Sequence, residues 1–228
     1  MLFASREQAG FKLGQHLREL NIQADQVLGL PRGGIVVAAE VAHMLRLSLD
    51  VIVVRKVGHP RHREFAVGAL AEGDVVLLDA SAMEKTNVLK EELDQVISEE
   101  EERLREYQLK FGQTQPAHLA ERTVLIVDDG LATGATTEAA VMSARKRKAR
   151  DVYVAVPVAS DNAFERISRI ADQVFTLLVD PDFDAVGRYY QQFTQTTDEE
   201  VISLLSANRH VHFNDMGKLE KPGEGEIS

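Results

Sequence analysis

The chain has 228 residues, 44% of them hydrophobic, contains no cysteine, and carries a formal net charge of −10 at pH 7. The lack of cysteine excludes disulfide frameworks, thiolate nucleophiles and cysteine-based zinc sites, and the acidic balance argues against a nucleic-acid partner, because phosphate contacts need a basic surface. No apolar run is long enough to cross a bilayer and the first residues lack a secretion-signal layout, so we expect a cytoplasmic protein without a membrane partner.

Short β-branched runs alternate with helical patterns along the chain. Strands are predicted at residues 27–30, 51–54, 75–78, 124–127, 152–156 and 174–178, and helices at residues 34–47 and 137–148. This alternation is typical of βαβ units, so we expect an α/β fold with a mainly parallel sheet flanked by helices. The composition predicts a single domain over residues 1–208 and a polar tail over residues 209–228.

Two regions interrupt the alternation. Residues 57–73 are polar, lack clear periodicity and are too long for a tight connection, which predicts a flexible loop. Residues 84–110 are highly charged, and their apolar residues are spaced as one helical stripe: Leu89, Leu93, Val96, Ile97, Leu104 and Tyr107. We predict a helical insertion there, either one long amphipathic helix or a helical hairpin, that packs on its own domain; a partner-binding arm is the alternative.

The motif with the most chemical content lies at residues 124–137. Four apolar residues predict a buried strand, and Asp128 and Asp129 follow it directly. Adjacent carboxylates can accept hydrogen bonds from vicinal hydroxyls or hold a divalent cation, and the Thr/Gly turn that follows presents backbone N–H groups at a helix N-terminus. The motif therefore predicts a sugar site beside a phosphate site, and a simple helix cap and turn is the alternative.

This motif resembles the phosphoribosyl pyrophosphate signature of type I phosphoribosyltransferases. The resemblance implies that Asp128 and Asp129 bind the ribose hydroxyls and Mg²⁺. It implies further that the 5-phosphate is bound by Ala132, Thr133, Gly134, Ala135, Thr136 and Thr137. The resemblance covers roughly residues 27–190, and the insertion at residues 84–110 is similar to that of stand-alone predicted phosphoribosyltransferases.

Two further segments carry the resemblance. Arg32, Gly33 and Gly34 follow the first predicted strand, where glycine permits close backbone approach to an anion and Arg32 adds a fixed charge. In the family this turn is the pyrophosphate loop. Arg55 and Lys56 follow the second predicted strand and resemble the pair that, in adenine and orotate phosphoribosyltransferases, neutralises the leaving pyrophosphate, often across a dimer interface. We therefore expect a homodimer. The alternative for residues 32–34 is an ordinary turn, and the alternative for Arg55 and Lys56 is a pair of solvated charges at a strand end.

The acceptor is less well defined. Residues 180–190 resemble the hood of hypoxanthine-type enzymes, and we expect residues 179–208 to form the hood and a C-terminal helix. Phe183 is the candidate to stack on a base, with a place in the core as the alternative. Ala132 stands where 6-oxopurine enzymes carry an acid, which counts against hypoxanthine and guanine, and no base can be named. Glu64, in the predicted flexible loop, is the candidate general base.

The resemblance implies phosphoribosyl transfer from phosphoribosyl pyrophosphate to a nitrogen acceptor, a nucleobase, with release of pyrophosphate. The rival hypothesis is a regulator that binds phosphoribosyl pyrophosphate or a nucleotide without turning it over. A DNA-binding regulator would need a basic helix-turn-helix, which the acidic sequence lacks. The basic run at residues 145–150 ends a predicted helix, where cations suit the helix dipole; a dimer or RNA contact is the alternative.

Overall fold

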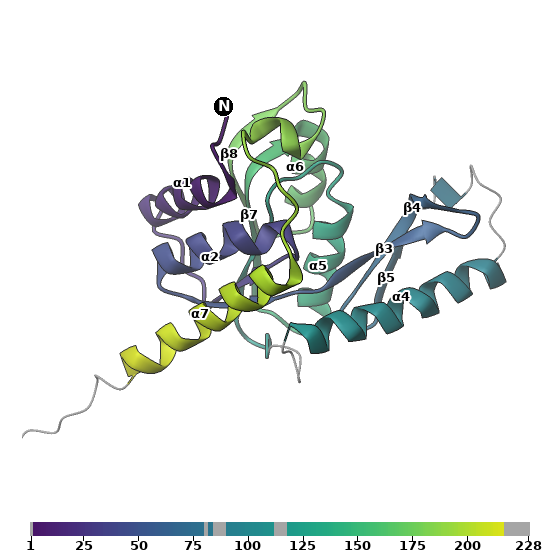
Figure 1. Cartoon of the computed structure of the whole chain (residues 1–228), viewed down its shortest axis with the longest axis horizontal. Helices are drawn as coiled ribbons and strands as arrows, with labels where there is room; N and C mark the ends of the chain where they lie inside the picture. The colour runs from purple at the N-terminus through teal and green to yellow at the C-terminus, as the bar shows by residue number, and fades with distance from the viewer. Residues whose placement is uncertain (1, 80–81, 84–89, 112–117, 217–228) are drawn as a thin grey trace, which may run out of the picture.

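A five-stranded sheet forms the centre of the molecule, with the strand order β2-β1-β6-β7-β8 (Figure 1). The computed structural model describes residues 2–79, 82–83, 90–111 and 118–216. The strands of this sheet are β1 (Gln26–Gly29), β2 (Ser48–Val51), β6 (Thr123–Val127), β7 (Asp151–Ser160) and β8 (Gln173–Asp180). Every neighbouring pair is parallel, which confirms the predicted α/β class.

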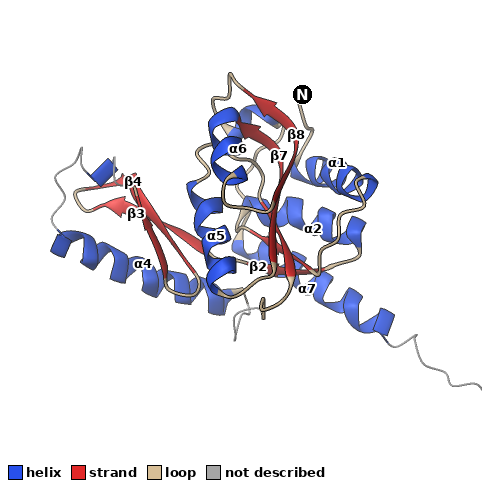
Figure 2. Ribbon diagram, turned by 180° about the vertical axis from the view of Figure 1, so that it is seen from behind, coloured by secondary structure: helices blue, strands red, loops and turns tan. Residues whose placement is uncertain are grey.

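Helices cover both faces of this sheet (Figure 2). One face carries α1 (Arg6–Glu19), α2 (Gly33–Leu45) and α7 (Asp198–Met216), and the other carries α5 (Ala135–Lys146) and α6 (Asp161–Ser168). Along β6, Leu125 and Val127 face the first core and Val124 and Ile126 the second, as the period of a strand requires. The sequence analysis missed α1 and α6. None of the described helices combines the length and apolar character of a membrane span.

A second, antiparallel sheet extends to the side of the main sheet, away from α1 (Figure 1). Its strands are β3 (Val54–His59), β4 (His62–Ala71) and β5 (Val75–Leu78). The prediction of a loop at residues 57–73 is therefore wrong, because these residues form most of the β3–β4 hairpin. The predicted strand at residues 51–54 is also wrong: β2 ends at Val51 in the parallel sheet, and β3 begins at Val54 in the other.

The helix α4 (Lys90–Lys110) lies along this hairpin (Figures 1 and 2). Leu93, Val96 and Leu104 are buried in the first core, and Ile97 and Tyr107 pack partly buried against it. This confirms the predicted helical stripe and its packing on the same domain over residues 90–110. Residues 84–89, which include the predicted stripe residue 89, lie outside the described residues.

The segment after β8 leads over the carboxyl edge of the main sheet into α7. The short helix η1 (Val186–Tyr189) lies in this segment, and Tyr190 forms a parallel bridge with Phe3. The helix α7 then continues to Met216, past the boundary predicted at residue 208, because no glycine or proline interrupts it. The polar tail predicted from residue 209 is therefore helical as far as Met216.

Candidate functional site

The carboxyl ends of β1 and β6 meet at one edge of the main sheet. Because the two strands pair in parallel, the turn that holds Gly33 and Gly34 lies against Asp128 and Asp129. A Cβ atom at Gly34 would lie 2.6 Å from Asp128 Oδ1, and one at Gly33 would collide with the carboxylate of Asp129. The structure thus brings two of the predicted segments into direct contact, and the close approach accounts for the two glycines.

The two carboxylates are poorly solvated. Burial raises the pKa of Asp128 well above its usual range, and the negative charge of Asp129 raises it further. Burial also raises the pKa of Asp129, against the opposing hydrogen bond from Arg6, whose Nε lies 2.7 Å from Asp129 Oδ2. A cation or hydroxyl groups supplied by a ligand would therefore favour the ionised form of this pair.

Arg6 is a site residue that the sequence analysis missed. It begins α1, and besides Asp129 it reaches the hood: its Nη1 donates to the Thr194 carbonyl at 2.7 Å, and its guanidinium lies 3.9 Å from the centre of the Phe193 ring. A signal was present in the sequence, because a cation at the first position of a helix opposes the helix dipole and so suggests a specific partner.

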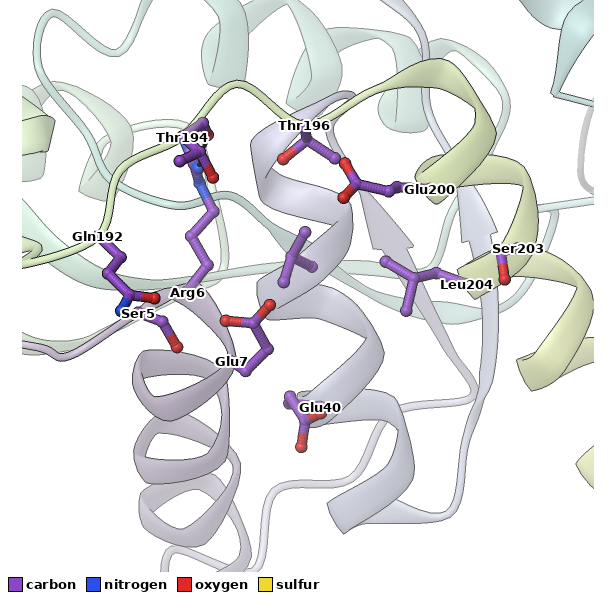
Figure 3. Close-up of a pocket in the computed structure, with 11 residues that line it drawn as sticks. Ser5, Arg6, Glu7, Glu40, Gln192, Thr194, Thr196, Glu200, Ser203 and Leu204 are labelled. Atoms are coloured by element: carbon purple, nitrogen blue, oxygen red, sulfur yellow. Dashed lines mark hydrogen bonds between the residues drawn. The ribbon is translucent and has the colours of Figure 1, made fainter.

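Arg6 also borders a cavity of about 310 Å³ between α1, α2 and α7 (Figure 3). Glu7, Glu40 and Glu200 line this cavity together with hydroxyl and amide side chains. In Figure 3 the side chain of Arg6 extends from the start of α1 towards Thr194. Arg6 separates this cavity from Asp129, because it lines the cavity and pairs with Asp129. The carboxylates of the cavity can accept hydrogen bonds from N–H groups of a ligand.

The turn at residues 132–137 leads into α5. Gly134 caps the helix with a left-handed backbone (φ 75°) and supplies no side-chain cap, so the N–H groups that follow Ala135 in the first turn of α5 are available to an anion. Thr133 Oγ1 accepts a hydrogen bond from Ala135 N at 3.4 Å. Thr137 is fully buried, and its hydroxyl has no hydrogen-bond partner within the described part of the chain. This turn is chemically suited to a phosphate group.

The predicted cations of the site come from two elements. Arg32 precedes α2, and its Nη1 lies 3.8 Å from Asp198 Oδ1 at the start of α7. Arg55 and Lys56 lie within β3, not beyond the end of a parallel strand as predicted. Lys56 is exposed, and its charge helps to lower the pKa of Asp128 against the larger effect of burial.

A second cavity, of about 550 Å³, joins these segments. Pro31 of the first turn, Thr136 of the second, and Arg55 and Lys56 of the hairpin all line it. Glu64, the candidate general base, is exposed on β4 and is not part of this lining among the described residues. The hairpin therefore brings Arg55 and Lys56, together with Arg63, but not Glu64, to the cavity between the two turns.

The hood is tied to the acid pair. Tyr190 donates from its hydroxyl to the Asp129 carbonyl at 2.6 Å, and Val186 packs so closely that a Cβ atom at Gly130 would lie 2.8 Å from it. Phe183 is half-buried, and its ring stacks on that of Tyr189 with 5.2 Å between the ring centres. The hood thus places Tyr190 beside the acid pair, whereas the predicted stacking residue Phe183 contacts Tyr189.

The basic run at residues 145–150 takes part in the fold. Arg145 pairs with Asp172 at 2.8 Å, and Arg147 pairs with Glu72 at 2.8 Å. Arg150 Nη2 lies 3.4 Å from Asp25 Oδ2. These contacts agree with the interpretation of the run as the basic end of a helix.

Comparison with known proteins places this arrangement in context. Residues 4–192 match the phosphoribosyl transferase domain family. A Mycobacterium tuberculosis H37Rv protein with the provisional name of phosphoribosyl transferase is 40% identical over 223 residues, which cover 96% of this chain and 49% of that protein. The chain thus spans about half the length of the curated relatives it matches. The crystal structure of TT1426 from Thermus thermophilus shares 42% sequence identity and a TM-score of 0.76, over 91% of this chain and 99% of that one.

Proposed function

The chain belongs to the phosphoribosyl transferase domain family, and on that premise we propose that it transfers a phosphoribosyl group from phosphoribosyl pyrophosphate to a nitrogen atom of a nucleobase. The observation that carries the proposal is the contact between the Asp128–Asp129 pair and the turn at Gly33 and Gly34. This contact supports a site for vicinal hydroxyls directly beside a site for an anion. A donor that joins a ribose to a pyrophosphate needs both at that separation.

The donor would occupy three adjoining parts of the site. Asp128 and Asp129 would accept hydrogen bonds from the ribose hydroxyls. The turn at residues 132–137 would bind the 5-phosphate through the uncapped N–H groups of α5, and a phosphate oxygen would give the Thr137 hydroxyl a partner. The pyrophosphate would lie against Gly33 and Gly34, beside Arg32.

Magnesium fits the residues of this site. Mg²⁺ in phosphate-transfer sites is held by one or two carboxylates together with the phosphates of the substrate. Asp128 and Asp129 supply two adjacent carboxylates whose pKa values burial raises, which is the environment that a cation would relieve. When bound, Mg²⁺ would offset negative charge on the leaving pyrophosphate.

In the reaction, a nitrogen atom of the acceptor forms a bond to C1 of the ribose while the bond from C1 to the pyrophosphate oxygen breaks. The electron pair of the broken bond leaves with the pyrophosphate. Arg32, Arg55 and Lys56 would stabilise that charge, and Glu64 is the candidate to take the acceptor's proton, although it must move into the site to do so.

The acceptor would bind on the hood side of the ribose. Phe183, stacked on Tyr189, is the proposed surface for a planar base. The cavity of Figure 3 offers carboxylates to N–H groups of the acceptor. We also propose that the predicted domain, residues 1–208 together with the rest of α7, acts as a homodimer.

The test is pyrophosphate release with Mg²⁺ and phosphoribosyl pyrophosphate against a panel of nucleobases and amines. We expect turnover with at least one nucleobase, and the double variant Asp128→Asn with Asp129→Asn should lose donor binding in calorimetry. Asp94→Asn, the same chemical change at an exposed position of α4, is the matched control. Unchanged donor affinity in the double variant would refute the site. Tight donor binding without turnover on any acceptor would favour a regulator that senses the donor.

A further inference from the structure

The hairpin arginines face acidic residues of α4. Arg63 Nη2 lies 2.8 Å from Glu99 Oε2, and Arg61 Nη2 lies 3.1 Å from Glu92 Oε1. The apolar stripe of α4 packs on the core, so these ion pairs add a polar seam along the same helix. The insertion is therefore attached directly to the element that carries Arg55 and Lys56.

Glu100 is the most buried acid of this seam, with a side chain that is only 8% exposed. Its Oε2 accepts a hydrogen bond from Arg55 Nε at 3.0 Å, and its Oε1 accepts one from Arg103. The guanidinium of Arg55 also lies 5.2 Å from the centre of the Tyr107 ring. One carboxylate thus holds two guanidinium groups side by side, and one positive charge remains uncompensated.

Both guanidinium groups border the cavity of about 550 Å³ beside Pro31 and Thr136. The charged side chains of its lining are Arg55, Lys56, Arg63, Arg103, Glu99 and Glu100. Four cations against two carboxylates leave an excess of two positive charges in the cavity. This excess lies next to both turns that are proposed to bind phosphate groups, which suits a polyphosphate.

We infer that Arg103 of the α4 insertion is a pyrophosphate-binding residue and that Glu100 positions it. The inference rests on the proposed function and deepens it, because it extends the pyrophosphate subsite beyond the strand–turn motifs to α4. Arg103 has a half-exposed side chain, so its guanidinium can exchange water for a phosphate oxygen at small desolvation cost. The buried Glu100 keeps Arg103 and Arg55 on the cavity side of the hairpin.

A purely structural role would look different in binding experiments. If Arg103 only formed a surface ion pair on α4, its removal would affect all ligands of the site equally, or none. If it binds pyrophosphate, its removal weakens only ligands that carry that group. The ratio of affinities for two ligands therefore separates the two roles.

The experiment is calorimetry on the full chain, with Mg²⁺, using phosphoribosyl pyrophosphate, inorganic pyrophosphate and ribose 5-phosphate as separate probes. Arg103→Ala should weaken the first two by about 10- to 100-fold, the loss of one charge-assisted contact, and leave ribose 5-phosphate unchanged. Arg103→Lys should recover part of the loss, and Glu100→Gln should weaken the same two probes. Arg105→Ala is the control, because it removes the same charge from α4 but lines a different cavity, beside Gly73.

The outcomes separate this inference from the proposed function. If the wild-type chain does not bind phosphoribosyl pyrophosphate, the proposed function fails, and the inference fails with it. If the wild type binds but Arg103→Ala binds equally well, only the inference is overturned. An equal loss for ribose 5-phosphate, or an equal loss in Arg105→Ala, would also overturn it, and higher affinity in Glu100→Gln would refute positioning by Glu100.

Discussion

Glu72 ties the second sheet to the helix that follows the phosphate turn. It lies between β4 and β5 and is 1% exposed. Its Oε1 accepts a hydrogen bond from Val53 N, at the start of the hairpin, and its Oε2 accepts one from Arg147, both at 2.8 Å. Its carbonyl accepts one from Ser143 of α5 at 2.6 Å. Replacing Glu72 should therefore weaken the attachment of the β3–β4 hairpin to α5 and lower the free energy of unfolding.

The magnitude follows from these contacts. Glu72→Ala removes the buried carboxylate partner of Arg147, whose own side chain is 12% exposed. Removal of one member of a buried ion pair costs about 3–5 kcal/mol. Burial raises the pKa of Glu72, which means that burial disfavours its ionised form. We therefore expect a loss of stability near the lower end of this range. For a chain of this size about 3 kcal/mol lowers Tm by about 10 °C. Glu72→Gln keeps an acceptor for Val53 N and should cost about 1–3 kcal/mol.

The assay is urea denaturation followed by circular dichroism, with a double-mutant cycle that combines Glu72→Ala and Arg147→Met. We expect a favourable coupling free energy of at least about 1 kcal/mol between the two residues. Glu102→Ala, an exposed acid on α4, serves as the control and should stay within about 0.5 kcal/mol of the wild type. If Glu72→Ala also stayed within that range, the assigned role of Glu72 would be wrong.

Three further predictions concern the acid pair, the phosphate turn and the hood. Gly34→Ala should lower donor affinity by about tenfold, because its Cβ would lie 2.6 Å from Asp128 Oδ1; calorimetry with phosphoribosyl pyrophosphate tests this, and unchanged affinity contradicts it. Gly134→Ala should destabilise the fold by about 1 kcal/mol in urea denaturation, because its φ of 75° is unfavourable with a Cβ atom, and equal stability would count against that backbone. Burial and the hydrogen bond to Asp180 raise the pKa of Tyr189 to about 12, so its stabilising contribution is present below pH 10 and is lost as the pH rises through about 12. In an alkaline absorbance titration, Tyr189→Phe should remove a component near pH 12, and identical curves would argue against the shift.

The parts of the fold that the sequence predicted well have local causes. β6 is a continuous apolar run followed by two acids, and both features depend only on neighbouring residues. The turn at Gly33 and Gly34 was equally visible, and the pairing of β1 with β6 made its contact with Asp128 a consequence of parallel topology. Burial of the α4 stripe could be predicted for the same reason, because helical periodicity is a local signal.

The hairpin could not be recognised in this way. Its strands carry Arg55, Lys56 and Arg63, its turn carries Arg61, and the arginines among them face acids of α4 instead of an apolar layer. A strand whose partner surface is polar lacks the alternation that marks a half-buried strand. The apolar run at residues 51–54 was wrongly predicted to be one strand for a related reason. The chain passes from one sheet to the other within this run, and an unbroken apolar run contains no signal of that change.

The net charge of the chain does not predict the local charge of the candidate site. A formal charge of −10 describes the field that a large partner meets, and salt screens that field over about 10 Å. A pyrophosphate at the proposed site would instead meet the side chains within contact distance. In the cavity beside Pro31 these include four cations and two acids, and one of the acids, Glu100, serves to hold Arg55 and Arg103 in place. An acidic chain can therefore hold a positively charged cavity, because some of its carboxylates bind the cations that line it.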